Sequence, residues 1–204
     1  MIDYTVHGLF PTPIYISELK RKFTTKENKF IQKTKGNVYK NTGNSTSNDT
    51  YILNNINFNK LKQELEEIVR DYFIKVLSTK NVSPYITQSW LNYTKKDQYH
   101  HKHRHANSIV SGVFYIDADK KHDKIHFFKN TFNSIEPAVD KFNTFNSGSW
   151  WFPVETGQLF LFPSSLEHMV ETKKGNNTRT SLAFNVFIKG DLGVNKNLTE
   201  LKIQ

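Results

Sequence analysis

The feature that most constrains the fold is a succession of short β-prone runs that begins after Pro84. Each run is rich in β-branched and aromatic residues, and Gly, Pro, Asn or charged residues separate it from the next. The runs are 85–94, 108–116, 124–129, 149–154, 158–163, 168–172 and 179–190. Short strands at fairly even spacing are typical of a β-sandwich or barrel, which is the architecture we predict for this part of the chain.

The first 84 residues predict a support of helical and extended segments. LFPTPIYI (9–16) is an extended piece interrupted by two prolines. The polar tract 36–50 is rich in Gly, Ser, Thr and Asn and predicts a flexible loop. A helix is predicted from Asn57 to Leu77, with Asn57 as its N-cap, because apolar residues recur every three or four positions. This apolar stripe, which should pack on the sheet, is Phe58, Leu61, Leu65, Ile68, Tyr72 and Val76.

Length and composition indicate one domain with a substantial core. The chain has 204 residues, of which 37% are hydrophobic and 14% aromatic. We divide the domain into the support at 1–84, a β core at 85–190 and a tail at 191–204. Cysteine is absent, which excludes disulfides and thiolate metal sites. No apolar run approaches the roughly 18 residues of a membrane span, and the N-terminus has no signal-peptide pattern, so we expect a cytoplasmic protein.

The net charge is +9, from 28 Lys and Arg against 19 Asp and Glu. Such a balance can indicate an anionic partner such as nucleic acid. The positive charges are dispersed, however, in pairs such as those at 95–96, 120–121 and 173–174. We therefore predict that they form a solvated surface, and nucleic acid is not the favoured partner.

The stretch YHHKHRH (99–105) contains four of the eight histidines and is the strongest candidate for a metal site. On an extended chain alternate side chains share a face, so His101, His103 and His105 should point together while His100 points away. Two of these three would be metal ligands. Periodicity alone leaves the pairs 101/103 and 103/105 equally good.

A metal site needs a further ligand, and a strand-end histidine facing the first pair would complete a three-ligand site. The remaining histidines are His7, His122, His126 and His168. His168 is the best placed, because it opens a β-prone run directly after the run 158–163 and a tight turn. Arg179 begins the last run and shares a face with Ser181. An inward-pointing Arg is costly unless it meets an anion, ideally a carboxylate.

Three motifs in this order resemble the 2-oxoglutarate- and Fe(II)-dependent oxygenases. They are HxHxxSxxSGxxY from His103 to Tyr115, PxxxGxLxLFPSxLxH from Pro153 to His168, and RxSxxFN from Arg179 to Asn185. The likeness is closest to a prolyl-hydroxylase-like subfamily of unassigned substrate from marine bacteria and phages, whose N-terminal signature is similar to LFPTPIY. The resemblance covers nearly the whole chain. A phage-encoded protein would act in the host cytoplasm.

The resemblance implies a mainly β fold with flanking helices, the jelly-roll-like or cupin-like double-stranded β-helix. It also implies iron held by a histidine, a carboxylate two residues further on, and a distal histidine. By position these ligands become His103, His105 and His168. His105 stands where the superfamily usually has Asp, although the subfamily itself carries HxH. Three neutral imidazoles also suit zinc.

The resemblance further implies that 2-oxoglutarate and O2 are cosubstrates and that succinate and CO2 are released on hydroxylation. The far carboxylate of 2-oxoglutarate would pair with Arg179 and accept a second hydrogen bond from Ser181. Asn92 and Tyr115 are further candidate contacts of the cosubstrate. No catalytic residue is expected beyond the metal centre.

Two other functions are compatible with the sequence. One is a cupin-like metalloprotein of another class, such as an isomerase or hydrolase that uses three histidines. The other is a non-enzymatic basic module that binds anions. For the oxygenase, the sequence does not identify the substrate, which could be a small molecule or a peptide, and it carries no signal for an oligomeric state.

Overall fold

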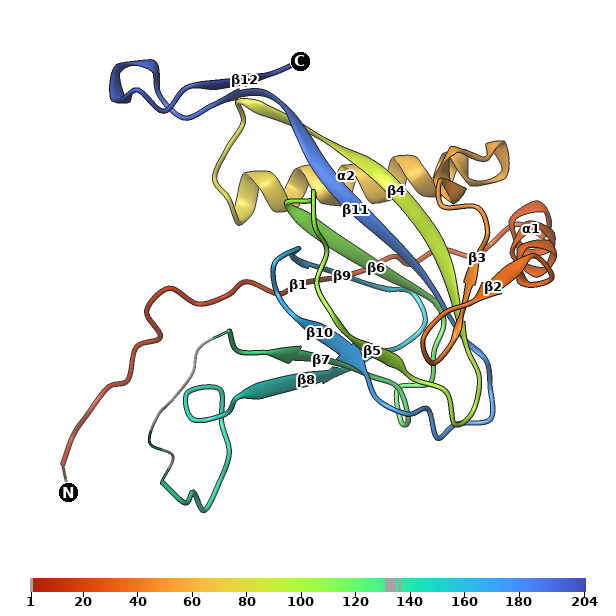
Figure 1. Ribbon diagram of the computed structural model, residues 1–204, viewed down its shortest axis with the longest axis horizontal. Helices are drawn as coiled ribbons and strands as arrows, with labels where there is room; N and C mark the ends of the chain where they lie inside the picture. The colour runs from red at the N-terminus through yellow and green to blue at the C-terminus, as the bar shows by residue number, and fades with distance from the viewer. Residues whose placement is uncertain (1, 131–134, 136) are drawn as a thin grey trace.

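The computed structural model describes residues 2–130, 135 and 137–204 (Figure 1). Its strands form a larger and a smaller antiparallel sheet. The larger sheet contains β1 (Tyr15–Glu18), β2 (Val38–Lys40), β3 (Ser45–Ser47), β4 (Val82–Thr94), β6 (Val110–Asp117), β9 (Gln158–Pro163), β11 (Arg179–Leu192) and β12 (Leu201–Ile203). The smaller contains β5 (His100–His103), β7 (Lys124–Phe128), β8 (Ser149–Pro153) and β10 (His168–Val170). Each predicted β-prone run contains a strand.

The two sheets have non-sequential strand orders. The larger runs β1-β9-β6-β11-β4-β3-β2, with β12 paired to β11, and the smaller runs β5-β10-β7-β8. An apolar cluster that includes Tyr115, Phe127, Phe160 and Phe162 joins residues of β6 and β9 to residues of β7. The chain thus crosses repeatedly between two sheets that share a core, as in a jelly roll.

Two helices support the larger sheet on its outer face. They are α1 (Thr25–Lys35) and α2 (Asn59–Lys75), and α2 lies across β4 and β11 (Figure 1). Short 3-10 turns are η1 (Ile52–Asn54), η2 (Ile56–Phe58) and η3 (Asn195–Asn197). No helix in the described part of the chain combines the length and the hydropathy that a membrane crossing requires.

The start of the long helix differs from the prediction. α2 begins at Asn59 because η2 occupies the preceding turn, and its N-cap Phe58 makes no side-chain cap. Asn57 is therefore not the cap; Asn55 caps η2 by accepting a hydrogen bond from the Asn57 backbone N–H. Most of the predicted apolar stripe is buried, with Val69 and Phe73 buried as well. Ile68 and Val76 are partly buried against the same core, so the apolar face is wider than predicted in the second half of the helix.

The prediction of a flexible loop at 36–50 is wrong, because this tract forms the β2–β3 hairpin and extends the larger sheet through β3 and β4. Asn44, Thr46 and Ser47 are buried. The Ser47 hydroxyl accepts a hydrogen bond from the backbone N–H of Leu91 at 3.0 Å. The sequence suggested that these polar side chains are solvated. In the structure the Ser47 hydroxyl bonds to a backbone group of the neighbouring strand, in place of a backbone partner.

Candidate metal centre and cosubstrate pocket

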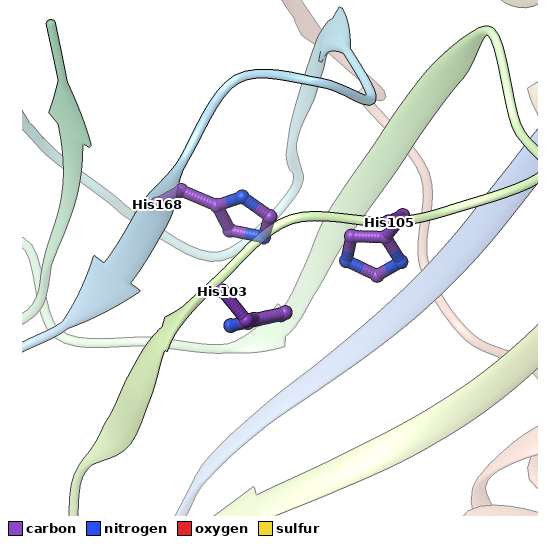
Figure 2. Close-up of side chains that lie close together, drawn as sticks. All are labelled: His103, His105 and His168. Carbon is purple, nitrogen blue, oxygen red and sulfur yellow. The ribbon is translucent and has the colours of Figure 1, made fainter. Parts of the chain in front are cut away.

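Strand pairing brings two distant histidines face to face. β5 and β10 are antiparallel neighbours, and His103 and His168 are Cα partners in their register. His105 follows β5, where its backbone N–H donates to the carbonyl of Ser164 at 3.0 Å. Each histidine offers one nitrogen, and these three atoms lie within 4.8 Å of one another (Figure 2). Among the described residues, this trio is the one group whose spacing could hold a metal ion.

Backbone carbonyls fix the orientation of two of the three rings. The Nδ1 atom of His103 lies 2.7 Å from the carbonyl oxygen of His101, and that of His168 lies 3.0 Å from the carbonyl oxygen of Leu166. A carbonyl can only accept, so Nδ1 carries the proton in each ring and Nε2 keeps the lone pair that a metal needs. This is the arrangement found around ligating histidines in metal sites.

The three imidazoles are neutral at physiological pH. Burial lowers the pKa of His168 to about 3, and the neighbouring His103 ring lowers it further. Burial also lowers the pKa of His105 to about 4, with His103 again contributing, although a hydrogen bond with Asn185 opposes the shift. Burial lowers the pKa of His103 in the same direction. Neutral imidazole is the form that binds metal, so the trio needs no deprotonation before it can act as a ligand set.

Aromatic rings surround the trio. The ring of Phe162 lies 4.7 Å from that of His168 in an edge-to-face arrangement, and Trp90 stacks on His105 at 5.6 Å. These contacts restrict the imidazole rings to one orientation and keep bulk water from one side of the site.

The alternation rule failed at His100, which does not point away. Its ring stacks on that of His103 with 4.6 Å between centroids and 19° between planes, and it lines the same cavity. The reason is an irregularity in the β5–β10 pairing: His168 faces His103, whereas Val170 faces His100, so three steps on β5 match two on β10. Such a bulge shifts a side chain to the other face of its strand.

The remaining histidines lie outside the trio. His101 lines an outer cleft, with its ring centroid 4.9 Å from that of His103. His122 pairs with Asp119 at 2.7 Å, and His126 lies 3.6 Å from a carboxylate oxygen of Glu171. His7 is exposed in the N-terminal segment.

The predicted cosubstrate contacts lie in a row across the larger sheet. Ser181 on β11 has Asn92 on β4 and Tyr115 on β6 as its Cα partners, and Thr46 on β3 is the partner of Asn92. Residues paired in this way project from the same face of a sheet. The Thr46 hydroxyl donates to Oδ1 of Asn92 at 2.9 Å, which directs the amide. Asn92, Ser181 and Tyr115 line a cavity of about 40 Å³ together with the three histidines and Arg179.

Arg179 already has an anionic partner in the structure. Its Nη1 atom lies 3.3 Å from Oδ1 of Asp123, and Lys173 contacts the same carboxylate at 3.0 Å. Burial lowers the pKa of Arg179, while Tyr115 and Asp123 oppose the shift. Lys173 belongs to a pair that the sequence predicted as solvated; its side chain has no exposed surface, whereas Lys174 is exposed. Sequence reasoning missed Asp123 and Lys173, because both stand in charged loop segments that look like ordinary surface.

An outer cleft of about 330 Å³ opens beside the trio and shares His100, His103, His105 and Trp90 with the inner cavity. Its other lining residues are Tyr39, Asn41, Thr46, Thr50, Gln88 and His101. None of these is acidic, and none is Lys or Arg. Trp150 and Trp151 line neither space, and Lys124 lies over the Trp151 ring at 4.2 Å.

Residues 88–185 match the sequence model of the family described as "putative 2OG-Fe(II) oxygenase". This segment resembles the 2OG-Fe(II) oxygenases. It contains the three histidines, Asn92, Tyr115, Ser181 and Arg179, so the resemblance predicted from the motifs is confirmed. No curated protein sequence matches the chain.

Three solved structures of other proteins share the fold. HygX from Streptomyces hygroscopicus, solved with nickel and 2-oxoglutarate, is 11% identical with a TM-score of 0.60 over 86% of this chain and 82% of its own. A prolyl-4-hydroxylase from Pseudomonas putida is 12% identical, with a TM-score of 0.54 over 85% and 92%. The carbocyclase SnoK from nogalamycin biosynthesis is 8% identical, with a TM-score of 0.61 over 88% and 81%. The predicted double-stranded β-helix is therefore confirmed.

Proposed function

We propose that this protein is an Fe(II)- and 2-oxoglutarate-dependent oxygenase of the hydroxylase type that works as a single domain over residues 1–204. The observation that carries the proposal is the trio of neutral, oriented imidazoles beside a cavity that contains a buried arginine. A metal site and an anion site side by side are what a metal-bound 2-oxo acid with a second carboxylate requires. The cytoplasmic location remains a sequence-based prediction.

The residues present fit both groups. His103, His105 and His168 would hold the metal, and three protein ligands leave the open positions that non-haem Fe(II) oxygenases use. Bound iron, with 2-oxoglutarate and O2, supplies the oxidising power for hydroxylation, and the products derived from 2-oxoglutarate are succinate and CO2. Because the three imidazoles are uncharged, they would leave a bound metal its full positive charge, which would favour binding of the 2-oxo acid carboxylate.

The protein's own side chains would bind and orient the cosubstrate. Arg179 would donate to the far carboxylate, and the Ser181 hydroxyl would donate a second hydrogen bond. Asn92 and Tyr115, in the same row as Ser181, are placed to contact the rest of the molecule. Phe162 and the adjoining apolar core would keep water from the inner side of the site.

The outer cleft would admit the substrate, a small molecule or a peptide. Its lining of hydroxyl, amide, phenol, indole and imidazole groups favours a part of the substrate that is uncharged and forms hydrogen bonds, since a buried charge there would meet no opposite charge. The shared fold does not fix the reaction, because SnoK is a carbocyclase and the Pseudomonas putida protein a prolyl-4-hydroxylase. Hydroxylation is the outcome proposed for this chain.

The metal assignment is tested with four single variants. His103→Ala, His105→Ala and His168→Ala should each lose bound Fe(II) or Ni²⁺ and the rise in melting temperature that metal gives the wild type. His101→Ala, in the same stretch, is the matched control and should keep both. Metal content and thermal denaturation of the purified proteins are the measurements. If His101→Ala empties the site while His105→Ala stays loaded, the ligand register is wrong.

The oxygenase assignment is tested with Arg179→Ala. This variant should keep its metal but lose 2-oxoglutarate binding in isothermal titration, along with the uncoupled conversion of 2-oxoglutarate to succinate. The expected loss is about 1.5–3 kcal/mol for each charge-assisted hydrogen bond removed. An unchanged dissociation constant, or stoichiometric zinc without 2-oxoglutarate binding in the wild type, would favour a metalloprotein of another class.

A further inference from the structure

Three charged side chains form a closed cluster at the inner end of the cavity. The Asp123 carboxylate accepts hydrogen bonds from Nζ of Lys173, at 3.0 Å to each oxygen, and from Nη1 of Arg179 at 3.3 Å. Asp123 has no exposed surface, and Lys173 and Arg179 are 1% and 3% exposed. We call these residues the inner triad.

The members of the inner triad differ in their access to the cavity. Arg179 lines it, whereas Asp123 and Lys173 are not among its lining residues. Only one guanidinium nitrogen of Arg179 bonds to Asp123. The arginine therefore sits between a fixed carboxylate behind it and the space where the proposed cosubstrate would lie.

Lys173 changes the net charge of the inner triad. Arg179 and Asp123 alone would be a neutral buried pair, and a guanidinium neutralised by its own carboxylate attracts a second carboxylate weakly. With Lys173 the triad has two cations and one anion, so one positive charge is left over. A buried excess charge is costly by itself, and one incoming carboxylate would balance it.

The surrounding backbone holds this arrangement in place. The backbone N–H of Asp119 donates to Oδ2 of Asp123 at 2.8 Å. The Lys173 backbone is bonded on both sides, donating to Gln98 O at 2.8 Å and accepting from Asp97 N at 2.9 Å. A Cβ added at Gly175 would lie 3.2 Å from Nζ of Lys173, so the glycine leaves room for the ammonium group.

We propose that Lys173 and Asp123 are positioning residues for 2-oxoglutarate: Asp123 orients Arg179, and Lys173 neutralises Asp123 so that the charge of Arg179 remains available to the far carboxylate. The inference rests on the proposed function, because it assigns Arg179 to that carboxylate. It predicts that a lysine outside the cavity sets the affinity for the cosubstrate.

The test compares Lys173→Met with the double variant Lys173→Met/Asp123→Asn. The single substitution leaves the neutral Arg179–Asp123 pair, so 2-oxoglutarate should bind about tenfold more weakly. The double substitution restores one net positive charge, and its affinity should recover to within about threefold of wild type. Lys120→Met is the matched control, because Lys120 forms an exposed ion pair with Glu155 at 2.9 Å; it should bind like wild type.

The measurement is isothermal titration of Ni²⁺-loaded protein with 2-oxoglutarate and with 2-oxovalerate, which lacks the far carboxylate. The affinity for 2-oxovalerate should be the same in all four proteins. Equal weakening for both ligands, or a double variant as weak as the single one, would show that Lys173 acts only through packing and would overturn the inference. So would a Lys173→Met protein that binds 2-oxoglutarate normally.

A failure of the proposed function has a different signature. If Arg179→Ala binds 2-oxoglutarate as well as wild type does, the carboxylate is not at Arg179 and the proposed function fails with it. If Arg179→Ala loses binding while Lys173→Met retains it, the proposed function stands and the inference about the inner triad is wrong. If Lys173→Met does not fold, the double variant tests the inference by itself. Weak binding of 2-oxoglutarate by the double variant would then contradict the prediction that one net positive charge restores the affinity.

Discussion

The two faces of β4 and β11 have opposite characters, although successive residues of each strand point to one face and then the other. Toward α2 these strands present Leu91, Tyr93, Leu182 and Phe184, all buried in one apolar cluster. Toward the smaller sheet they present Trp90, Asn92, Arg179 and Ser181, which line the inner cavity. The helix-facing side is built to stabilise the sheet, whereas the cavity-facing side uses the rigidity of the sheet to fix polar groups in place. Substitutions on the two faces should therefore fail in different ways.

The largest effect on stability is expected from Leu182→Ala on the helix-facing side. Leu182 has no exposed surface, and truncating a buried leucine typically costs about 2–5 kcal/mol. Urea denaturation should show this loss, while the metal and 2-oxoglutarate affinities of the folded protein stay near wild type. A large loss of affinity without a loss of stability would contradict the division between the two faces.

Gly112→Ala should damage both faces at once. A Cβ at Gly112 would come within 2.2 Å of the Phe184 ring, its cross-strand neighbour, and Gly112 also lines the cavity. The ring would have to shift, at a cost of about 1–3 kcal/mol. Thermal denaturation and 2-oxoglutarate titration should both change. The double variant Gly112→Ala/Phe184→Leu should recover part of the lost stability if the clash is the cause.

The helix support should weaken at acid pH. Burial raises the pKa of Glu27, but hydrogen bonds from Arg21 and from the backbone and hydroxyl of Thr24 outweigh it, so the folded-state pKa lies below the usual 4.5. A depressed carboxylate pKa adds stability above the unfolded-state value, and this stability is lost as the pH falls through the folded-state pKa.

Glu27→Gln should therefore lower the free energy of unfolding by about 1–3 kcal/mol at pH 7, and the two proteins should become equally stable in strong acid. Urea denaturation at pH 7, 5, 4 and 3 measures this. A constant difference between wild type and variant across the series would exclude the ionised Glu27 as the source.

The smallest effect is expected from Ser181→Ala, next to Leu182 but on the cavity side. The side chain is small and its loss should change the free energy of unfolding by less than about 1 kcal/mol. One hydrogen bond to 2-oxoglutarate would be lost, which weakens binding by about 0.5–1.5 kcal/mol. Titration should thus detect Ser181→Ala where denaturation hardly does, the reverse of Leu182→Ala.

Much of this architecture could be predicted because it follows local periodicity. The helix α2 and the strands β4, β6, β7, β8, β9, β10 and β11 come from apolar patterns within single segments. Arg179 and Ser181 both line the cavity, as their alternation along the strand predicts. The β2–β3 hairpin was missed because its strand residues are Ser, Thr and Asn, which also form loops. His100 was placed on the wrong face because a bulge depends on the partner strand, which the sequence of β5 does not describe.

The inner triad was missed for a similar reason. Asp123 and Lys173 lie far apart in the sequence, in segments whose charges resemble those of any solvated loop. Their burial results from how the loops after β6 and β10 close over the end of the sheet. Asn185 ends the RxSxxFN motif, yet its hydrogen bond with His105 could not be inferred without the fold.

The unequal lengths of the strands imply unequal mobility within the site. Arg179 and Ser181 belong to a 14-residue strand that is hydrogen-bonded to β4 and β6, whereas His103 and His168 belong to strands of four and three residues. Local opening should be rare in the long ladder and frequent in the short one. Amide hydrogen exchange should accordingly be slow along β11 whether or not metal is present. Along β5 and β10 it should be fast without metal and slow once an ion links the two strands.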